Sequence, residues 1–167
     1  GYGLNTGAIY RIREEMGADV LLTCDNGISA FEQVLYAKGL GLTTIVLDHH
    51  DIPVDQTGQM QLVAADAVVN PKRPDCPYPF KLYCAAAICF RFAEALYLHY
   101  KIDWIRIREQ LLPFAAMATV CDLVDLVGEN RAIVKQGLPL LAQSQNPGLL
   151  ALMEATGLLN TELTAYH

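Results

Sequence analysis

Two short apolar runs, each followed directly by an acidic residue, constrain the fold of this chain more than any other feature. Residues 20–24 form a near-continuous apolar segment that ends at Asp25, and the β-branched segment 43–47 ends at Asp48. Runs of this length and composition are typical of strands that are buried on both faces of a sheet. We therefore expect two buried strands whose carboxyl ends both carry acids.

The segments around these runs predict an alternation of helices and strands. A helix is expected over residues 6–16 with Asn5 as its cap, and a second helix is expected from a Ser29 cap to about residues 39–41. Residues 64–70 have the pattern of a third, shorter strand. Helices that alternate with strands through short connections predict an α/β fold, with a Rossmann-like parallel β-sheet and flanking helices.

The second half of the chain has a different pattern. Residues 71–80 contain four prolines and predict an extended loop. The rest of this half is expected to be mostly helical, with Pro113 as the start of a helix or a kink in it. The expected helices lie over residues 81–100, 103–121, 131–142 and 148–156.

Composition excludes several classes of protein. With 53% hydrophobic and 18% charged residues, the chain is not expected to be disordered. A net charge of −6 excludes a protein that wraps nucleic acid by bulk positive charge, although a local basic patch is compatible with it. The chain lacks both an uninterrupted apolar run long enough for a membrane span and a signal-peptide pattern at its start. The five cysteines form no Cys-x-x-Cys pair and predict reduced core thiols of a cytoplasmic protein.

Side chains able to bind a metal ion follow both predicted strands. They are Asp25 after the first strand and Asp48, His49 and His50 after the second. In an open α/β sheet the functional site lies outside the carboxyl ends of the strands, so these side chains converge if the strands are parallel and adjacent. Oxygen and nitrogen ligands of this kind suit Mn²⁺ or Mg²⁺. Asp122, which follows an apolar run, is a candidate to complete the set.

Ordinary structural roles compete with each assignment taken alone. Asp-Asn-Gly is a common turn, an acid after a strand often caps a helix, and Asp122 has Arg131 as an alternative partner. Two adjacent imidazoles beside a carboxylate are costly to desolvate, however, and packing explains them poorly. Lys72, Arg73 and Arg131 are candidates to contact phosphates, although a solvated charge is the more common role for such residues.

The order of these motifs resembles that of the DHH phosphoesterases, and among them the RecJ-type single-strand-specific DNA exonucleases. The matching segments are Asp-Asn-Gly-Ile-Ser-Ala at 25–30, Asp-His-His at 48–50, the proline-rich segments at 70–74 and 78–81, and Val-Gly-Glu-Asn-Arg at 127–131. The Asp-His-His triplet marks the superfamily. The proline loop and the Gly-Glu-Asn-Arg segment resemble the RecJ branch more than the pyrophosphatases or small-oligonucleotide phosphodiesterases.

The resemblance implies a phosphodiesterase with two Mn²⁺ or Mg²⁺ ions that releases 5′-mononucleotides from the 5′ end of single-stranded DNA. By match to the family's motifs, Asp25 bridges both ions, and His49 and Asp122 are further metal ligands. His50 would face the phosphate or support the site, and Asp48 would orient a neighbouring imidazole. The expected setting is DNA repair and recombination in the cytoplasm, with a single-strand-binding protein as a candidate partner.

The chain also departs from the family's pattern. The family's first metal motif is expected upstream and a DHH-associated domain downstream, so residues 1–167 are expected to be a partial DHH domain that binds one ion weakly and has little activity. Ala85, Ala87 and Ala118 stand where the family commonly has glycine. Two other hypotheses stay open: a phosphodiesterase acting on short oligonucleotides or cyclic dinucleotides, and a degenerate DHH module that binds without catalysis.

Overall fold

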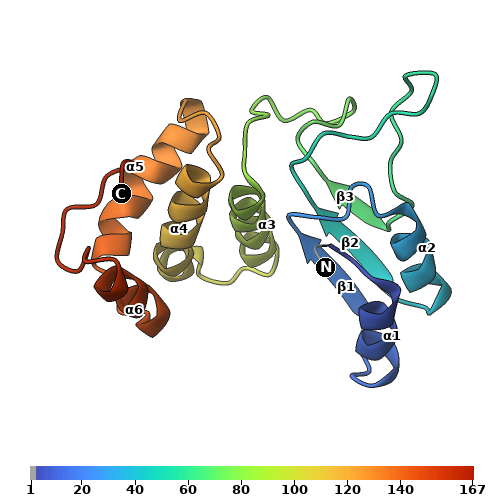
Figure 1. Cartoon of the computed structure of the whole chain (residues 1–167), viewed down its shortest axis with the longest axis horizontal. Helices are drawn as coiled ribbons and strands as arrows, with labels where there is room; N and C mark the ends of the chain where they lie inside the picture. The colour runs from blue at the N-terminus through green and yellow to red at the C-terminus, as the bar shows by residue number, and fades with distance from the viewer. Residues whose placement is uncertain (1–2) are drawn as a thin grey trace. The chain divides into compact units, whose positions relative to one another are not determined.

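The structure is a computed structural model that describes residues 3–167. The chain forms two compact units, Gly1–Lys81 and Leu82–His167. The boundary separates the sheet from the helical half of the chain, as the change of sequence pattern predicts (Figure 1). No helix among residues 3–167 combines the length and apolarity that crossing a membrane requires.

The first unit contains a parallel sheet of three strands in the order β1-β2-β3. The strands are β1 (Val20–Cys24), β2 (Thr43–Leu47) and β3 (Ala67–Val69), and the helices of this unit are α1 (Thr6–Glu14) and α2 (Phe31–Gly39). The first two strands have the bounds that the apolar runs predicted. Asn5 caps α1 as expected, because its side chain accepts a hydrogen bond of 2.8 Å from the Ala8 N–H. The α/β prediction is therefore confirmed.

The prediction that β1 is buried on both faces is wrong. Leu21 and Thr23 are buried, whereas the alternate residues Val20, Leu22 and Cys24 are exposed. Ile9 of α1 and Ala37 of α2 form one core cluster with Leu21, so both helices contribute to the core on one face of the strand. Alternation along a strand then leaves every second side chain of β1 outside this core.

Ser29 does not cap α2, contrary to the prediction. The N-cap is Ala30, which makes no capping hydrogen bond through its side chain. The Ala30 N–H donates to the carbonyl of Gly27 at 3.0 Å, so Ser29 lies within a turn rather than at the helix entry. The helix begins one residue later than the cap signal indicated.

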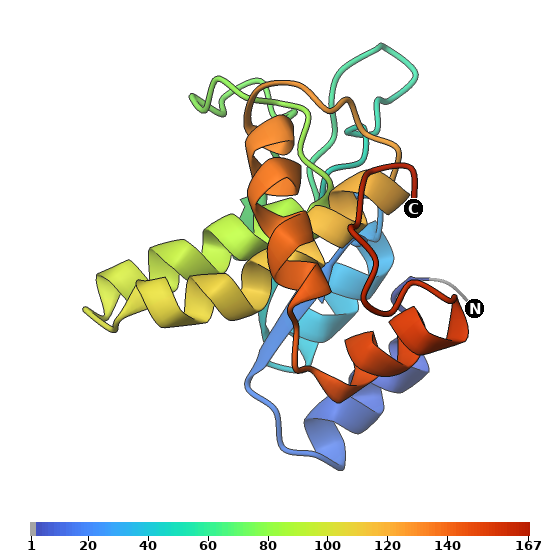
Figure 2. The ribbon, with the colours of Figure 1, turned by 90° about the vertical axis from the view of Figure 1, so that its left-hand side faces the viewer.

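The second unit consists of helices within its described residues. They are α3 (Ala85–His99), α4 (Trp104–Cys121), α5 (Gly128–Ala142) and α6 (Pro147–Ala155). Figure 2 shows α3 and α4 side by side, joined by a short turn. α4 continues through Pro113, which therefore does not start a helix. Cys24 and Cys121 were predicted to lie in the core, but both are exposed.

The three alanines at positions where the family resemblance leads us to expect glycine all lie within helices. Ala85 and Ala87 are in the first turn of α3, Ala118 is in α4, and none of them has a positive φ angle. Alanine is the residue most favourable to a helix, so these changes are compatible with the fold.

Gly137 allows α4 and α5 to pack at close range. A Cβ atom at this position would lie 2.4 Å from the Cβ of Ala116 and 2.8 Å from the backbone oxygen of Leu112. Both distances are shorter than van der Waals contact, so any larger side chain would push the helices apart.

Candidate metal centre

Asp25 follows β1 in an unusual backbone conformation. Its φ angle is 65°, in the left-handed region, and its N–H donates to the carbonyl of Leu47 at 3.0 Å. Gly27, two residues later, has a φ of 112°, and a Cβ there would lie only 2.8 Å from Oγ1 of Thr23. Glycine is therefore required at this turn, and the turn fixes Asp25 at the carboxyl edge of the sheet.

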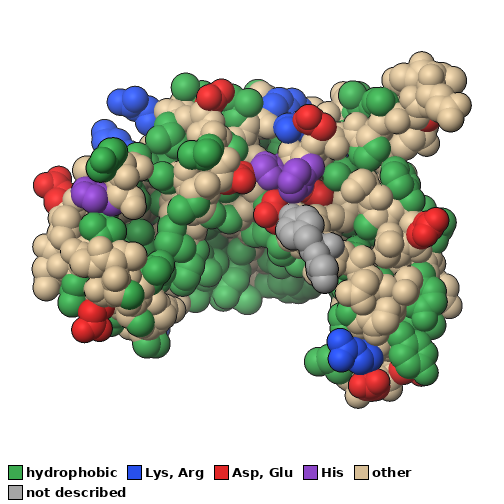
Figure 3. Space-filling model, viewed as in Figure 1, with side chains coloured by type: hydrophobic (Ala, Val, Ile, Leu, Met, Phe, Trp, Pro, Cys, Tyr) green, Lys and Arg blue, Asp and Glu red, His purple; other side chains and the backbone are tan. Residues whose placement is uncertain are grey.

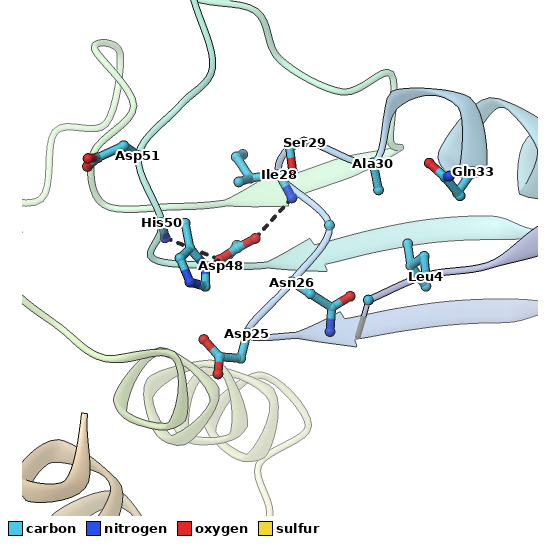
Figure 4. Close-up of a pocket in the computed structure, with 12 residues that line it drawn as sticks. Leu4, Asp25, Asn26, Ile28, Ser29, Ala30, Gln33, Asp48, His50 and Asp51 are labelled. Carbon is cyan, nitrogen blue, oxygen red and sulfur yellow. Dashed lines mark hydrogen bonds and ion pairs between the residues drawn. The ribbon is translucent and has the colours of Figure 1, made fainter. Parts of the chain in front are cut away.

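Asp48 is buried below this edge and accepts hydrogen bonds from two loops. One oxygen accepts from the N–H of Ile28 at 2.9 Å. The other accepts from the N–H groups of His49 and His50, at 2.8 and 3.2 Å, and lies 2.7 Å from Nδ1 of His50. Burial by itself raises the pKa of Asp48, but the bonds from Ile28, His50 and His49 outweigh it and hold the pKa below its ordinary value. An ionised Asp48 thus joins the turn after β1 to the histidine pair (Figure 4).

This contact also sets the tautomer of His50. An ionised carboxylate can only accept a hydrogen bond, so Nδ1 of His50 must carry the proton. In the neutral ring the lone pair is then on Nε2, the nitrogen that does not face Asp48. The side chain of His50 is 51% exposed, so its ring is not enclosed by the protein.

Asp25, His49 and His50 converge, as expected for residues that follow parallel neighbouring strands. One ligand atom from each lies within 4.8 Å of the others, and we call these three residues the metal cluster. Nε2 of His49 is 3.3 Å from Oδ1 of Asp25, and the two imidazole rings are 4.6 Å apart between centroids. Figure 3 shows histidine and acidic side chains gathered together on the surface.

The donor set of the metal cluster fits a divalent ion. Two ligands of one ion, with bonds of about 2.1 Å, lie no more than about 4.2 Å apart. The 3.3 Å between Asp25 and His49 is within that limit. A ring nitrogen of His50 lies within 4.8 Å of the other two ligand atoms, close to the same limit. A carboxylate with two imidazoles can bind several divalent ions, so this donor set by itself does not select Mn²⁺ or Mg²⁺.

A pocket of about 390 Å³ opens beside the metal cluster in the first unit. Asp25, Asp48 and His50 line one part of it, and the turn after β1 lines another (Figure 4). Its remaining lining is Gly3, Leu4, Asn26, Gly27, Ile28, Ser29, Ala30, Gln33 and Asp51. Its backbone and polar side chains leave room for a small polar group next to the cluster.

The two cations of the proline loop are both engaged by acids. Nζ of Lys72 is 2.8 Å from Asp51, the residue after His50, and this pair holds the pKa of Asp51 below its usual value. The guanidinium of Arg73 donates to the carbonyl of Val68 at 2.6 Å and to Asp75, which raises the pKa of Arg73. Arg73 therefore binds the backbone of β3, whereas Lys72 lies beside the histidine pair.

Asn70, which is only 2% exposed, lies in the matching segment 70–74, but sequence reasoning assigned it no role in the site. Its Nδ2 donates to the carbonyl of His50 at 2.9 Å, and its Oδ1 accepts from the N–H of Lys72 at 2.9 Å. The rule that singled out Asp25 and Asp48, a polar residue directly after a strand, also applies to Asn70 after β3. The apolar run before it is short, and for that reason it gave a weaker signal.

Asp122 and Arg131 belong to the second unit. Asp122 is the C-cap of α4, with its N–H bonded to the carbonyl of Ala118 at 2.9 Å, and Arg131 is exposed in the first turn of α5.

Within the Gly-Glu-Asn-Arg segment, Glu129 accepts from Tyr83 and Arg91. The buried Asn130 donates to the carbonyls of Leu82 and Asp125. The last of these bonds anchors the loop that follows Asp122.

Comparison with known families places most of the chain in one of them. Residues 4–119 match the model of the DHH family, N-terminal domain. Proteins described as single-stranded-DNA-specific exonuclease RecJ are similar over most of the chain. The protein of Bacillus subtilis strain 168 is 36% identical over 94% of this chain, and that of Escherichia coli K12 is 34% identical over 92%.

A solved structure agrees with these relatives. The crystal structure of exonuclease RecJ bound to manganese matches 99% of this chain with a TM-score of 0.78 and 28% sequence identity. The chain spans 39% of that structure, and it spans 18% of the Bacillus subtilis protein and 27% of the Escherichia coli protein. The similarity therefore covers both units of this chain but a minor part of each relative.

Proposed function

Since the chain belongs to the DHH family, we propose that it is part of a metal-dependent 5′→3′ exonuclease that degrades single-stranded DNA to 5′-mononucleotides. The observation that carries this proposal is the metal cluster, in which Asp25, His49 and His50 offer ligand atoms within 4.8 Å of one another over the buried Asp48. The substrate class is taken from the relatives, whose names specify single-stranded DNA.

The roles of the residues follow from the contacts in the first unit and from the motif match. Asp25 and His49 are proposed metal ligands, and Asp122 is proposed as a further ligand on the motif match alone. Two bound Mn²⁺ or Mg²⁺ ions would activate the attacking water and neutralise charge on the phosphate. Asp48 keeps a proton of His50 on Nδ1, and Nε2 of His50 would donate to the scissile phosphate or its leaving oxygen when the ring carries a second proton, because an unprotonated Nε2 can only accept.

Cations near the cluster are proposed to contact the DNA backbone. Lys72 lies beside the histidine pair through its contact with Asp51, so a phosphate could displace that carboxylate from the ammonium group. Arg73 and Arg131 are further proposed phosphate contacts. A mutation of any of them is expected to weaken binding to all sequences alike, because phosphates carry no sequence information.

We also propose that residues 1–167 are a partial DHH domain, with the remaining metal ligands and a DHH-associated domain supplied by segments outside it. The small share of each relative that the chain spans supports this proposal. An exonuclease of this kind would act in DNA repair and recombination in the cytoplasm, where single-stranded DNA is bound by a single-strand-binding protein.

The test compares this chain and the product of its complete reading frame in Mn²⁺ with labelled nucleotide substrates, the linear ones carrying the label at the 5′ end. The substrates are long single strands, duplexes, dinucleotides and cyclic dinucleotides. We expect the complete protein to release mononucleotides from long single strands, and this chain to show little activity. Asp25→Ala and His49→Ala should abolish the activity of the complete protein. Glu14→Ala, an exposed acid on α1, is the matched control.

Each other outcome selects a different function. Activity confined to dinucleotides or cyclic dinucleotides would indicate the short-substrate phosphodiesterase. Binding of DNA without hydrolysis, unchanged by Asp25→Ala, would indicate a non-catalytic module. Robust degradation of long strands by residues 1–167 alone would contradict the proposal that the domain is partial.

A further inference from the structure

We propose that Asn70 is a positioning residue that holds His50 in the metal cluster, and that it couples the proline loop after β3 to metal binding. This inference rests on the proposed function, in which His50 serves the metal and phosphate site. It adds a residue that lies outside the motifs after β1 and β2 and that donates to the backbone of the histidine pair rather than to a metal.

The amide of Asn70 bridges two loops from a buried position. It donates to the carbonyl of His50 and accepts from the N–H of Lys72, both at 2.9 Å, and its side chain is almost completely enclosed. The orientation of the amide is determined by these partners, because a flipped amide would place oxygen against oxygen and N–H against N–H. Both ends of the side chain are therefore used in holding the loops together.

His50 depends on polar contacts for its position. Half of its side chain is exposed, so packing cannot fix the ring. Two side chains hold the residue: Asp48 accepts from Nδ1 and from the backbone N–H of His50, and Asn70 donates to its backbone carbonyl. Without the Asn70 bond, the carbonyl of His50 would lose its side-chain donor while the N–H and the ring remained attached to Asp48, so Nε2 would shift relative to Asp25 and His49.

The ion pair between Lys72 and Asp51 links the same two loops but cannot replace Asn70. Its atoms are 2.8 Å apart, yet the side chain of Asp51 is 93% exposed and that of Lys72 is 38% exposed. Exposed ion pairs contribute little and are screened by salt, whereas a buried amide that loses a partner leaves groups unsatisfied. Asn70 is therefore the determinant of the coupling, and Lys72 is the matched residue for comparison.

The sharpest variant is Asn70→Asp, which keeps the size of the side chain. It removes the donor and places a carboxylate oxygen against the carbonyl of His50. We expect Mn²⁺ binding to the full chain, measured by electron paramagnetic resonance, to weaken about 10-fold, as is typical when a residue that orients a metal ligand is lost. Lys72→Met, which removes the ion pair with Asp51 but leaves the bonds of the Asn70 side chain, should keep the Mn²⁺ affinity within about 2-fold of the wild type. Asn5→Ala, which removes the cap of α1, controls for a general loss of stability.

Two further measurements separate positioning from general damage. The nitrogen resonances of the His50 ring report its tautomer and surroundings, and we expect them to shift in Asn70→Asp but not in Asn5→Ala. In a His50→Ala background, Asn70→Asp should weaken Mn²⁺ binding no further, because its effect passes through His50. If Asn70→Asp does not fold, Asn70→Ser, whose hydroxyl is shorter, takes its place in both measurements.

The outcomes distinguish this inference from the proposed function. If the wild-type chain and the complete protein bind no Mn²⁺, the proposed function fails, and the shift of the His50 resonances still decides the role of Asn70. Unchanged His50 resonances in Asn70→Asp would overturn the inference. A loss of Mn²⁺ affinity that adds fully to that of His50→Ala would also overturn it.

Discussion

Replacing Asp48 with asparagine tests the hydrogen-bond network beneath the metal cluster. The carboxylate accepts from three backbone N–H groups and from the ring of His50. An asparagine oxygen can retain the bonds to the histidine pair, but its NH₂ group then faces the N–H of Ile28. One bond to a charged acceptor is lost, and a buried N–H is left unsatisfied. These two effects together are expected to cost about 3 kcal/mol.

The pH dependence of the same variant follows from the direction of the pKa shift. The pKa of Asp48 is lower in the folded state than the unfolded value of about 3.9, so its contribution is present above about pH 4 and is lost as the pH falls through the folded pKa. The difference in unfolding free energy between the wild type and Asp48→Asn should therefore be largest near pH 7. It should shrink below about pH 4.

Urea denaturation of the two proteins from pH 7 to pH 3 measures this difference. The single tryptophan, Trp104, is in α4 of the second unit, so its fluorescence reports that unit, and far-ultraviolet circular dichroism or amide signals of β1 and β2 report the first. A loss of less than about 1 kcal/mol at pH 7, or a difference that does not change with pH, would refute the reasoning.

Three further predictions concern packing, charge and helix propensity. Gly137→Ala should destabilise the second unit by about 2 kcal/mol in Trp104 fluorescence melts, because its Cβ would lie 2.4 Å from that of Ala116; an unchanged melt would contradict the close packing. Hydrogen bonds from the backbone and hydroxyl of Thr44 and the contact with Lys38 lower the pKa of Asp66 to about 2, so stability that depends on it should fade between about pH 4 and pH 2. In Asp66→Asn, the free energy of unfolding measured in urea should therefore change less over this pH range than in the wild type. Ala118→Gly should lower stability by about 1 kcal/mol in urea, since the position is helical.

The sequence predicted the strands well because each apolar run stops at a polar residue. The bounds of β1 and β2 and the meeting of Asp25 with the histidine pair follow from this pattern together with parallel pairing. The burial of β1 could not be predicted, because a run of apolar residues does not specify which face the helices cover. The helix cap predicted at Ser29 was also wrong, because a turn closed by the hydrogen bond from Ala30 to Gly27 shifts the start of α2 by one residue.

The support beneath the cluster was harder to predict than the cluster. Asp48 was expected to orient an imidazole, but its bond to the Ile28 N–H joins residues 20 positions apart. Asn70 is likewise 20 residues from His50. Contacts of this kind depend on how two loops meet at the end of a sheet. A single sequence carries no periodic signal for them.

The left-handed backbone of Asp25 lowers the stability of the fold at a position where the proposed function needs a carboxylate. A residue with φ near 65° carries a conformational cost of about 1 kcal/mol that glycine avoids. Mutation and selection for a well-folded domain alone would therefore favour glycine or asparagine at this site. Selection retains a carboxylate there only while its negative charge serves a function. If a lineage lost the proposed activity, this position would be among the first expected to change, and its replacement by glycine would mark that loss in a set of related genomes.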